Sequence, residues 1–302
     1  IHSHNVNGFE NSRDFLHNAC ETEAFSILAL QEHWLRPSFR KQKGTNKLKI
    51  LHSKYDSYAT SAMSSQVGSR VLKGRPYGGT GFLFHKDLSK CVRARVDLKC
   101  DRVTVIELCT KTDKILLLNC YIPYFITGND EAQLNEYRET VAFIENVMVS
   151  HSSHKFILLM DFNCNIFNNA HPYSMLINSI ISDYDLSTNY SYMKSFDPQS
   201  SFTRFDVKRN SYTLIDGILF SRSLACSLLS SSILNPFDNN SDHLPLEIVF
   251  NFELEEYVHP EPKLSNYIPW SSLSPRDIDT FHESMFLGSG PDRGRSPVEW
   301  GE

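Results

Sequence analysis

Hydrophobic residues occur along this chain in short unbroken runs separated by polar segments, and one run stands at its centre. Residues 156–160 read FILLM and are followed by Asp161 and Asn163. An unbroken run of this length indicates a strand buried on both faces. Asp161 and Asn163 are two residues apart, so in an extended backbone their side chains point to the same side and can share one substrate group. The alternative is that this segment only begins a turn, which Asp and Asn favour.

A second run, residues 25–30, ends in the same way, because Glu32 follows it directly. Further segments predict strands at residues 1–8, 55–59, 81–84, 92–96, 103–108, 115–121, 214–221, 230–235 and 244–252, with two short strands between residues 201 and 213. In the first of these, Asn5 and Asn7 are expected to face the same side. Helical spacing predicts helices at residues 9–23, 131–150 and 173–184. Polar residues directly after buried strands are typical of sites in layered α/β folds.

Length and composition indicate a globular protein with a large core. The chain has 302 residues, of which 41% are hydrophobic, and residues 1–257 are predicted to form one domain. No apolar run approaches the roughly 20 residues of a membrane helix, and the first residues have no signal-peptide pattern. We therefore expect no membrane association and no secretion. The chain begins without Met, close to a predicted strand, and we interpret it as a fragment of a longer polypeptide.

Cysteine usage and charge narrow the picture further. Seven cysteines are scattered without a C-x-x-C pair, which argues against a cysteine zinc cluster and a disulfide framework and indicates reduced, intracellular thiols. The net charge of -5 does not indicate a nucleic-acid binder, but residues 36–54 hold seven Lys or Arg and no acid. This segment forms either a local basic surface or a solvated loop.

A set of polar residues is predicted at strand ends or in the loops directly after them: Asn5, Glu32, Tyr121, Asp161, Asn163, Asp216, Asp242 and His243. Acids of this kind hold a hard divalent cation, Asn amides fix phosphate oxygens, and an Asp–His pair positions groups on a phosphate. Asp216 lies among apolar neighbours and is available to orient His243. The set indicates metal-assisted phosphodiester hydrolysis.

A polar, basic segment at residues 204–211 (RFDVKRNS) lies between two predicted strands. We expect it to project beyond the site, and the resemblance described below implies that it contacts DNA. Lys208 and Arg209 would attract phosphates, Arg204 and Asn210 would reach base edges, and Thr203 would lie on the phosphate side of the site. The alternative is a hairpin tip that is polar only because it is solvated.

Eight segments, taken in order, resemble motifs of the endonuclease/exonuclease/phosphatase superfamily: HNVNGF, LQEHWL, GGTGFLF, NCYIPY, LMDFNCN, SFTRF, YTLIDGILFS and NNSDHLPLEIVF. Within that superfamily they resemble the apurinic-like endonuclease domain of non-LTR (LINE-type) retrotransposons. The resemblance spans residues 1–252. It implies an α/β fold, a four-layered sandwich in which two packed, mostly antiparallel or mixed sheets are flanked by helices.

The resemblance also implies a role for each residue of the site. Glu32 would be the principal Mg²⁺ ligand, with Asn5 and Asn7 beside it, and Asp242 would complete the metal or general-base side. Tyr121 would act on the phosphate and Asn163 would bind a phosphate oxygen. Asp161 would activate or orient the attacking water. His243, oriented by Asp216, would contact the phosphate.

The chain departs from the family's pattern at three positions. Met160 stands where the family usually has Gly, Tyr124 where Asn often follows the Pro, and Asn7 where the repair enzymes carry Asp. Asn in place of Asp at position 7 lowers the negative charge of the site, which argues against a second metal ion. The segment between Thr203 and Asp216 is short, whereas abasic-site repair enzymes tend to have a longer insertion there. The resemblance therefore favours a retrotransposon endonuclease over abasic-site repair.

The function implied is that of a metal-dependent DNA endonuclease, with Mg²⁺ or alternatively Mn²⁺ as cofactor. It would nick one strand by phosphodiester hydrolysis and leave a 3′ hydroxyl that primes reverse transcription. Its partners would be DNA and a reverse transcriptase domain on the same parent polypeptide, and the fragment would be a monomer that acts in the nucleus. Residues 258–302 are expected to be a linker or disordered tail. Two alternatives stay open, a phosphatase of the same superfamily acting on an inositol phosphate or phospholipid head group, and an inactive, domesticated DNA-binding domain.

Overall fold

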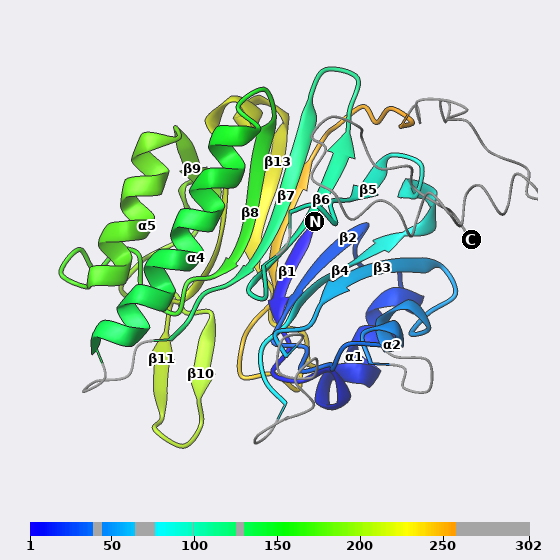
Figure 1. The fold of residues 1–302 in the computed structure, drawn as a ribbon. Coiled ribbons are helices and arrows are strands. Elements are labelled where there is room, and N and C mark those ends of the chain that lie inside the picture. Colours follow the sequence, from blue (N-terminus) through cyan, green and yellow to red (C-terminus); the bar gives the residue numbers. More distant parts are fainter. Residues whose placement is uncertain (39–43, 64–75, 99, 125–129, 258–302) are drawn as a thin grey trace, which may run out of the picture. The chain divides into compact units, whose positions relative to one another are not determined.

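Two six-stranded sheets lie at the centre of the computed structural model, which describes residues 1–38, 44–63, 76–98, 100–124 and 130–257 (Figure 1). The first sheet has the order β13 (Leu228–Ile233), β14 (Leu246–Phe250), β1 (His2–Asn5), β2 (Ile27–Gln31), β4 (Thr80–His85) and β3 (Tyr55–Thr60). The second has the order β5 (Val92–Ala94), β6 (Val103–Cys109), β7 (Lys114–Tyr121), β8 (Lys155–Asp161), β12 (Asp216–Ser221) and β9 (Leu186–Thr188). The pairs β1–β2 and β7–β8 are parallel and the other neighbours are antiparallel, so both sheets are mixed.

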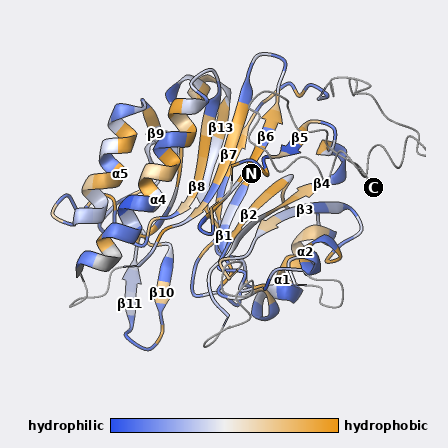
Figure 2. Cartoon of the chain, viewed as in Figure 1, coloured by the Kyte–Doolittle hydropathy of each residue, from blue (hydrophilic) through white to orange (hydrophobic). Residues whose placement is uncertain are grey.

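Helices cover the outer face of each sheet. Helix α1 (Phe9–Glu21) packs on the first sheet through Phe15, Leu16 and Cys20, with the short α2 (Asn46–Lys49) beside it. Helices α4 (Asp130–Ser150) and α5 (Pro172–Asp183) cover the second sheet. Figure 2 shows the hydrophobic residues gathered in the strands and on the inner faces of these helices. The predicted α/β fold, a four-layered sandwich, is confirmed.

The central strand β8 explains why its sequence is an unbroken apolar run. Ile157 and Leu159 face the first sheet and belong to the core between the sheets. Phe156, Leu158 and Met160 point the other way and pack under α4 and α5. Both faces of the strand are therefore buried, as the pattern predicted.

The other predicted elements are present with shifts of a few residues at their ends, and two details differ. Strand β1 ends at Asn5, and Asn7 has a φ of 45°, so Asn5 and Asn7 are not on one face of a continuous strand. Within the polar segment 36–73, expected to be a loop with one strand, α2 forms at residues 46–49. The short strands near the predicted basic hairpin are β10 (Arg204–Asp206) and β11 (Ser211–Thr213), which pair with each other alone among the described strands.

Residues 1–257 form one compact unit. The expected linker or tail, residues 258–302, lies outside the described residues, as do residues 39–43 of the basic segment. None of the described helices has both the length and the apolar character that a membrane crossing requires.

Two glycines allow the segment after β2 to pack closely against its neighbours. Gly8 has a φ of 97°, and a Cβ there would lie 2.6 Å from a ring atom of Trp34. Gly79 has a φ of 87°, and a Cβ there would lie 2.4 Å from the ring of His33. Both positions therefore require glycine, for backbone conformation and for space. The His33 ring is buried, with Nε2 bonded to the Thr60 carbonyl at 3.0 Å and Nδ1 accepting from the Leu35 amide at 2.9 Å.

We expect His33→Gln to make stability less sensitive to acid. Burial lowers the pKa of His33 to about 4 despite opposing backbone hydrogen bonds, whereas an unfolded histidine titrates near about 6.5. Between these values only the unfolded chain binds the proton, so stability falls as pH is lowered, by up to about 1.4 kcal/mol per pH unit. Urea unfolding gives the free energy of unfolding at about pH 7.5 and at about pH 5. The loss of this free energy between the two pH values should be smaller by roughly 2 kcal/mol in the variant.

The half-buried His85 on β4 supplies the matched control for this measurement. Comparing the pH dependence of stability in a variant with that in the wild type cancels the contribution of every titrating group that the two proteins share. An equal pH dependence in wild type, His33→Gln and His85→Gln would show that His33 is not held neutral by the fold.

Candidate active site

Three site residues lie in one row across the second sheet. Tyr121 at the end of β7 is paired with Asp161 at the end of β8, and Asp161 is paired with Asp216 at the start of β12. In the first sheet Asn5 is paired with Gln31, and Glu32 follows directly. Register alone therefore brings residues from distant parts of the chain to the same end of the two sheets.

His243 lies in the loop before β14 and is oriented by Asp216. Its Nδ1 donates to both carboxylate oxygens of Asp216, at 3.0 and 2.9 Å, and the histidine is only 4% exposed. Burial alone would lower the pKa of His243, but the charge and hydrogen bond of Asp216 outweigh it and raise the pKa to about 9. His243 is therefore an imidazolium at neutral pH and can donate to an anionic oxygen.

Asp161 is completely buried at the centre of the row. Its Oδ2 accepts from the Asn5 side chain at 2.8 Å and its Oδ1 accepts from the backbone amide of Asn163 at 2.9 Å. Burial and then the nearby charge of Asp216 raise the pKa of Asp161 to about 8. A carboxyl group with a pKa near neutrality can exchange a proton during a reaction.

Glu32 lies at the end of β2 with a φ of 52°, and both of its carboxylate oxygens are engaged. Oε1 accepts from Asn5 at 3.0 Å, and Oε2 accepts from the indole of Trp34 at 3.0 Å. The Tyr121 side chain also hydrogen-bonds Glu32. Burial, followed by the charges of Glu32 and Asp161, raises the pKa of Tyr121, so its phenol stays protonated and acts as a donor.

Asp242 is held by two side chains on the other side of the site. Asn7 Nδ2 donates to Oδ1 at 2.9 Å, and Arg204 Nε donates to Oδ2 at 2.8 Å. Asp242 was expected to be a metal ligand and Arg204 to reach DNA bases. In this structure the two residues pair with each other, so Arg204 ties the base of the β10–β11 hairpin to the loop before β14.

Asn163 does not lie on a continued strand, contrary to the expectation from residue spacing. Strand β8 ends at Asp161, and Asn163 has a φ of 50°. The side-chain amide of Asn163 donates to the Ile122 carbonyl at 2.7 Å. Its position beside Asp161 therefore comes from a turn and from β7, and not from an extended backbone.

Thr203 was expected to contact the substrate, and in the structure its side chain is fully buried. The Thr203 hydroxyl oxygen accepts from the amides of Ile215 and Asp216, both at 3.1 Å. Thr203 thus fixes the start of β12, and with it the carboxylate that orients His243. Lys208 and Arg209, in contrast, are exposed at the hairpin tip.

The residues of the site fit a hard divalent cation. Four carboxylates, from Glu32, Asp161, Asp216 and Asp242, face two cationic side chains, Arg204 and protonated His243. The side-chain nitrogen of Asn5 donates to both Glu32 Oε1 and Asp161 Oδ2, so these two acids converge on one amide, and oxygen atoms are the ligands that Mg²⁺ prefers. Ligand atoms of Asp161, Asp216 and His243 also lie within 4.8 Å of one another. The negative excess and the donor chemistry together suit a cation at Glu32 and Asn5.

A pocket of about 530 Å³ flanks Glu32 on the side of α1. Trp34 and Phe9 supply apolar walls, and Arg36 and Lys47 supply positive charge. Lys47 forms an ion pair with Glu10 of α1, so part of the basic segment 36–54 is neutralised by that helix. The described part of the segment therefore gives the pocket a basic edge, at which Lys47 is paired with an acid.

Several residues that support the site were not found from sequence. Gln31 donates to the side chain of Asn119 at 2.7 Å, and Asn119 donates to the Leu30 and Gly81 carbonyls at 2.9 and 2.7 Å. This buried network links the two sheets beneath the site. Trp34 holds Glu32 from the other side. The only signal was the polar character of Gln31 and Asn119 inside otherwise apolar strands.

A scan against protein-family models found no match, and no curated protein sequence matched the chain. Solved structures do match. The Xenopus laevis APE2 catalytic domain has a TM-score of 0.64 at 16% identity, covering 89% of this chain and 97% of that one. The AP endonuclease LMAP from Leishmania major has a TM-score of 0.62 at 17% identity, covering 84% of this chain and 87% of that one.

A third match is the 3′ phosphatase NExo from Neisseria, bound to a product DNA hairpin, with a TM-score of 0.57 at 18% identity, covering 83% of this chain and 98% of that one. A protein described as an endonuclease/exonuclease/phosphatase family member, from Leptotrichia buccalis, also matches. At these identities the likeness establishes the fold. The chain thus has the sandwich fold of AP endonucleases and of this wider group.

Proposed function

We propose that the chain is a metal-dependent DNA endonuclease that nicks one strand and leaves a 3′ hydroxyl. The observation that carries the proposal is the constellation at one end of the sandwich, in which the Asp216–His243 pair faces the Glu32–Asn5–Asp161 group. Such a site offers a donor to a phosphate oxygen on one side and a cation position on the other. The fold, shared with AP endonucleases, supports the same reading.

The chemistry assigns a task to each side chain. A divalent cation at Glu32 and Asn5, Mg²⁺ or alternatively Mn²⁺, would neutralise developing negative charge on the phosphate. His243 and Tyr121 donate hydrogen bonds to phosphate oxygens. Asp161, with its pKa near neutrality, orients the attacking water and receives its proton. The water oxygen bonds to phosphorus as the bond to O3′ breaks, and the departing O3′ takes up a proton from solvent, which leaves a 5′ phosphate and a free 3′ hydroxyl.

DNA is favoured over a small phosphorylated head group by the β10–β11 hairpin. Figure 1 shows this hairpin projecting beyond the ends of the sheets. Its tip carries Lys208 and Arg209. Val207, which precedes them in the chain, is 76% exposed. A small ligand bound in the site would not extend to this hairpin, whereas a DNA duplex would. We further propose that the nicks prime reverse transcription by a domain of the same parent polypeptide, in the nucleus, as in non-LTR retrotransposons.

The direct test uses a supercoiled plasmid, incubated with the protein in Mg²⁺ and in EDTA. We expect conversion to the open circular form in Mg²⁺ only, followed by extension of the nicks with a DNA polymerase, which requires a 3′ hydroxyl. A closed circle has no ends, so an enzyme limited to 3′ exonuclease or 3′ phosphatase action leaves it supercoiled. Release of phosphate from inositol phosphates without nicking would favour the head-group phosphatase instead.

Exchange of the hairpin tip is expected to change where the plasmid is nicked while the cation requirement stays the same. Residues 206–211 would be replaced by a different hairpin of equal length, with Arg204 kept because it holds Asp242. The tip contacts DNA at a distance from the reacting phosphate, so it affects site choice and not chemistry. Primer extension maps the nicks. The same distribution of nicks before and after the exchange would show that the tip does not take part in target choice.

A further inference from the structure

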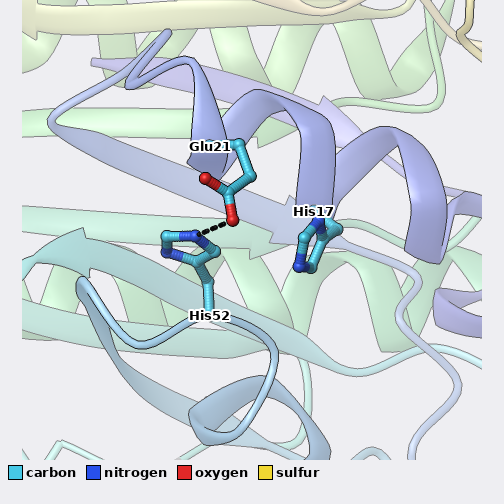
Figure 3. Close-up of side chains that lie close together, drawn as sticks. All are labelled: His17, Glu21 and His52. Carbon is cyan, nitrogen blue, oxygen red and sulfur yellow. Dashed lines mark ion pairs between the residues drawn. The ribbon is translucent and has the colours of Figure 1, made fainter.

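A second cluster of metal-ligating side chains lies away from the active site. His17 and Glu21 are four residues apart on α1, so they lie on the same face of the helix. His52, from the segment between α2 and β3, lies opposite them (Figure 3). The nitrogen and oxygen atoms that these three side chains can offer to a metal all lie within 4.8 Å of one another. No task in the proposed reaction requires them.

We propose that His17, Glu21 and His52 form a binding site for a divalent transition-metal ion, with Zn²⁺ as the best-suited ion. Two imidazoles and one carboxylate are a donor set that Zn²⁺ accepts readily and that Mg²⁺ does not prefer. Tetrahedral coordination at about 2.1 Å places ligand atoms roughly 3.4 Å apart. The widest spacing, at most 4.8 Å, therefore has to close by up to about 1.4 Å, and the 2.9 Å between Glu21 and His52 has to open by about 0.5 Å, which the exposed side chains of His17 and Glu21 can achieve by rotation.

The geometry between the three residues is already close. Glu21 Oε1 lies 2.9 Å from His52 Nε2, and the rings of His17 and His52 are 5.4 Å apart. His52 is buried, with a side chain only 5% exposed, so one ligand is held rigidly by the fold. The hydrogen bond from His52 lowers the pKa of Glu21, which keeps the carboxylate charged. Lys54, the nearest ammonium, is engaged by Glu23.

Metal binding requires one change of protonation. His52 Nδ1 now accepts from the Lys54 backbone amide at 3.2 Å, so the neutral ring carries its proton on Nε2 and donates it to Glu21. Coordination through Nε2 moves that proton to Nδ1 without change of net charge. The Lys54 amide then loses a long hydrogen bond, and Lys54 is exposed, so water can replace it. The cost of this change is small beside the bonds formed to the metal.

The site would join α1 to the segment that leads from α2 to β3. Two ion pairs already tie neighbouring residues together, Lys47 of α2 with Glu10 of α1, and Lys54 with Glu23, which follows α1. A bound ion adds a third, stronger link and makes the position of this basic segment depend on metal. Because α1 begins directly after Asn7 and Gly8, the linkage lies at the opposite end of α1 from the active site.

The experiment measures Zn²⁺ binding to the full chain by isothermal titration calorimetry in excess Mg²⁺, without DNA. The protein carries Asp161→Asn, which removes a carboxylate of the active site. We expect one saturable site whose affinity falls at least about tenfold in His17→Ala and in Glu21→Gln. Glu23→Gln, in the turn directly after the same helix and paired with Lys54, is the matched control and should bind as the parent does. Equal affinity in the parent, His17→Ala and Glu21→Gln would overturn the proposal.

The chain's cysteines are competing ligands for Zn²⁺, so the ion must also be located. Co²⁺ in the same site should give visible bands of nitrogen and oxygen coordination without a thiolate charge-transfer band, and His17→Ala should remove them. At a Zn²⁺ concentration about 100 times the parent's dissociation constant, the melting temperature should rise by roughly 5–10 °C in the parent and by at most about half as much in His17→Ala. A thiolate band that persists in His17→Ala would place the ion on cysteine and overturn the proposal.

Discussion

Replacing Glu32 by Gln is expected to lower cation-dependent nicking by roughly 10³-fold while the fold is retained. Glu32 supplies the charged oxygen donors at the strand end, and both of its oxygens accept hydrogen bonds, from Asn5 and from Trp34. An amide in its place is uncharged and offers a donor where the protein already supplies donors. Single-turnover cleavage of a labelled duplex gives the rate, and circular dichroism checks the fold.

Trp34 provides a second readout that does not depend on activity. Its indole donates to Glu32 Oε2, so a cation that binds there should change the emission of Trp34. The other two tryptophans, Trp270 and Trp300, would be replaced by Phe to isolate the signal. Mg²⁺ should change the emission in this background and not after Glu32→Gln. Nicking at the wild-type rate in Glu32→Gln would remove Glu32 from the cation site.

The second large effect is expected at His243. His243→Ala should slow cleavage by at least about 10²-fold, the loss typical of missing acid–base assistance. The Asp216 carboxylate raises the pKa of His243 to about 9, so the imidazolium persists through neutral pH and is lost above that value. If the imidazolium of His243 is the acid and the carboxylate of Asp161 the base, the rate should rise toward about pH 8 and fall beyond about pH 9.

Asp216→Asn tests this explanation without removing the histidine. The Asn oxygen can still accept from Nδ1, but the charge that stabilises the imidazolium is gone, so the pKa of His243 should fall. The alkaline limb of the pH–rate profile should then move down by more than about one pH unit. Asp185→Asn, which removes an exposed acid paired with Arg222, is the control and should leave the profile in place. A limb that does not move in Asp216→Asn would mean that another group controls it.

The positions of strands and helices followed from sequence wherever burial itself is the cause. Residues 156–160 are apolar because β8 is covered on both faces, and the spacing of α1 places Phe15, Leu16 and Cys20 against the first sheet. Burial of a segment constrains which residues that segment can contain, so its own hydrophobic pattern reveals it. The polar residues that end buried strands, Asp161 and Glu32 above all, were visible for the same reason.

Side-chain contacts between distant segments could not be read in this way. Thr203 was expected at the substrate and instead holds the amides of Ile215 and Asp216, and Arg204 is paired with Asp242, 38 positions away along the chain. Each contact depends on where β12 and the loop before β14 come to lie, which pairing between strands decides. Backbone conformation had a similar effect at Asn163, where a φ of 50° ends the extended run.

The sequence by itself determined the α/β class, the buried strands and the types of residue available for phosphate chemistry. It did so because hydrophobic periodicity reports burial and because carboxylate, amide and imidazole groups have fixed chemical abilities. Only the tertiary structure decided which of these groups meet. The pairing of β8 with β7 and β12 aligns Tyr121, Asp161 and Asp216, and the packing of α1 brings Glu21 to His52. The distance between two residues along the sequence does not reveal such side-chain contacts, because the register of strands and the packing of layers determine them.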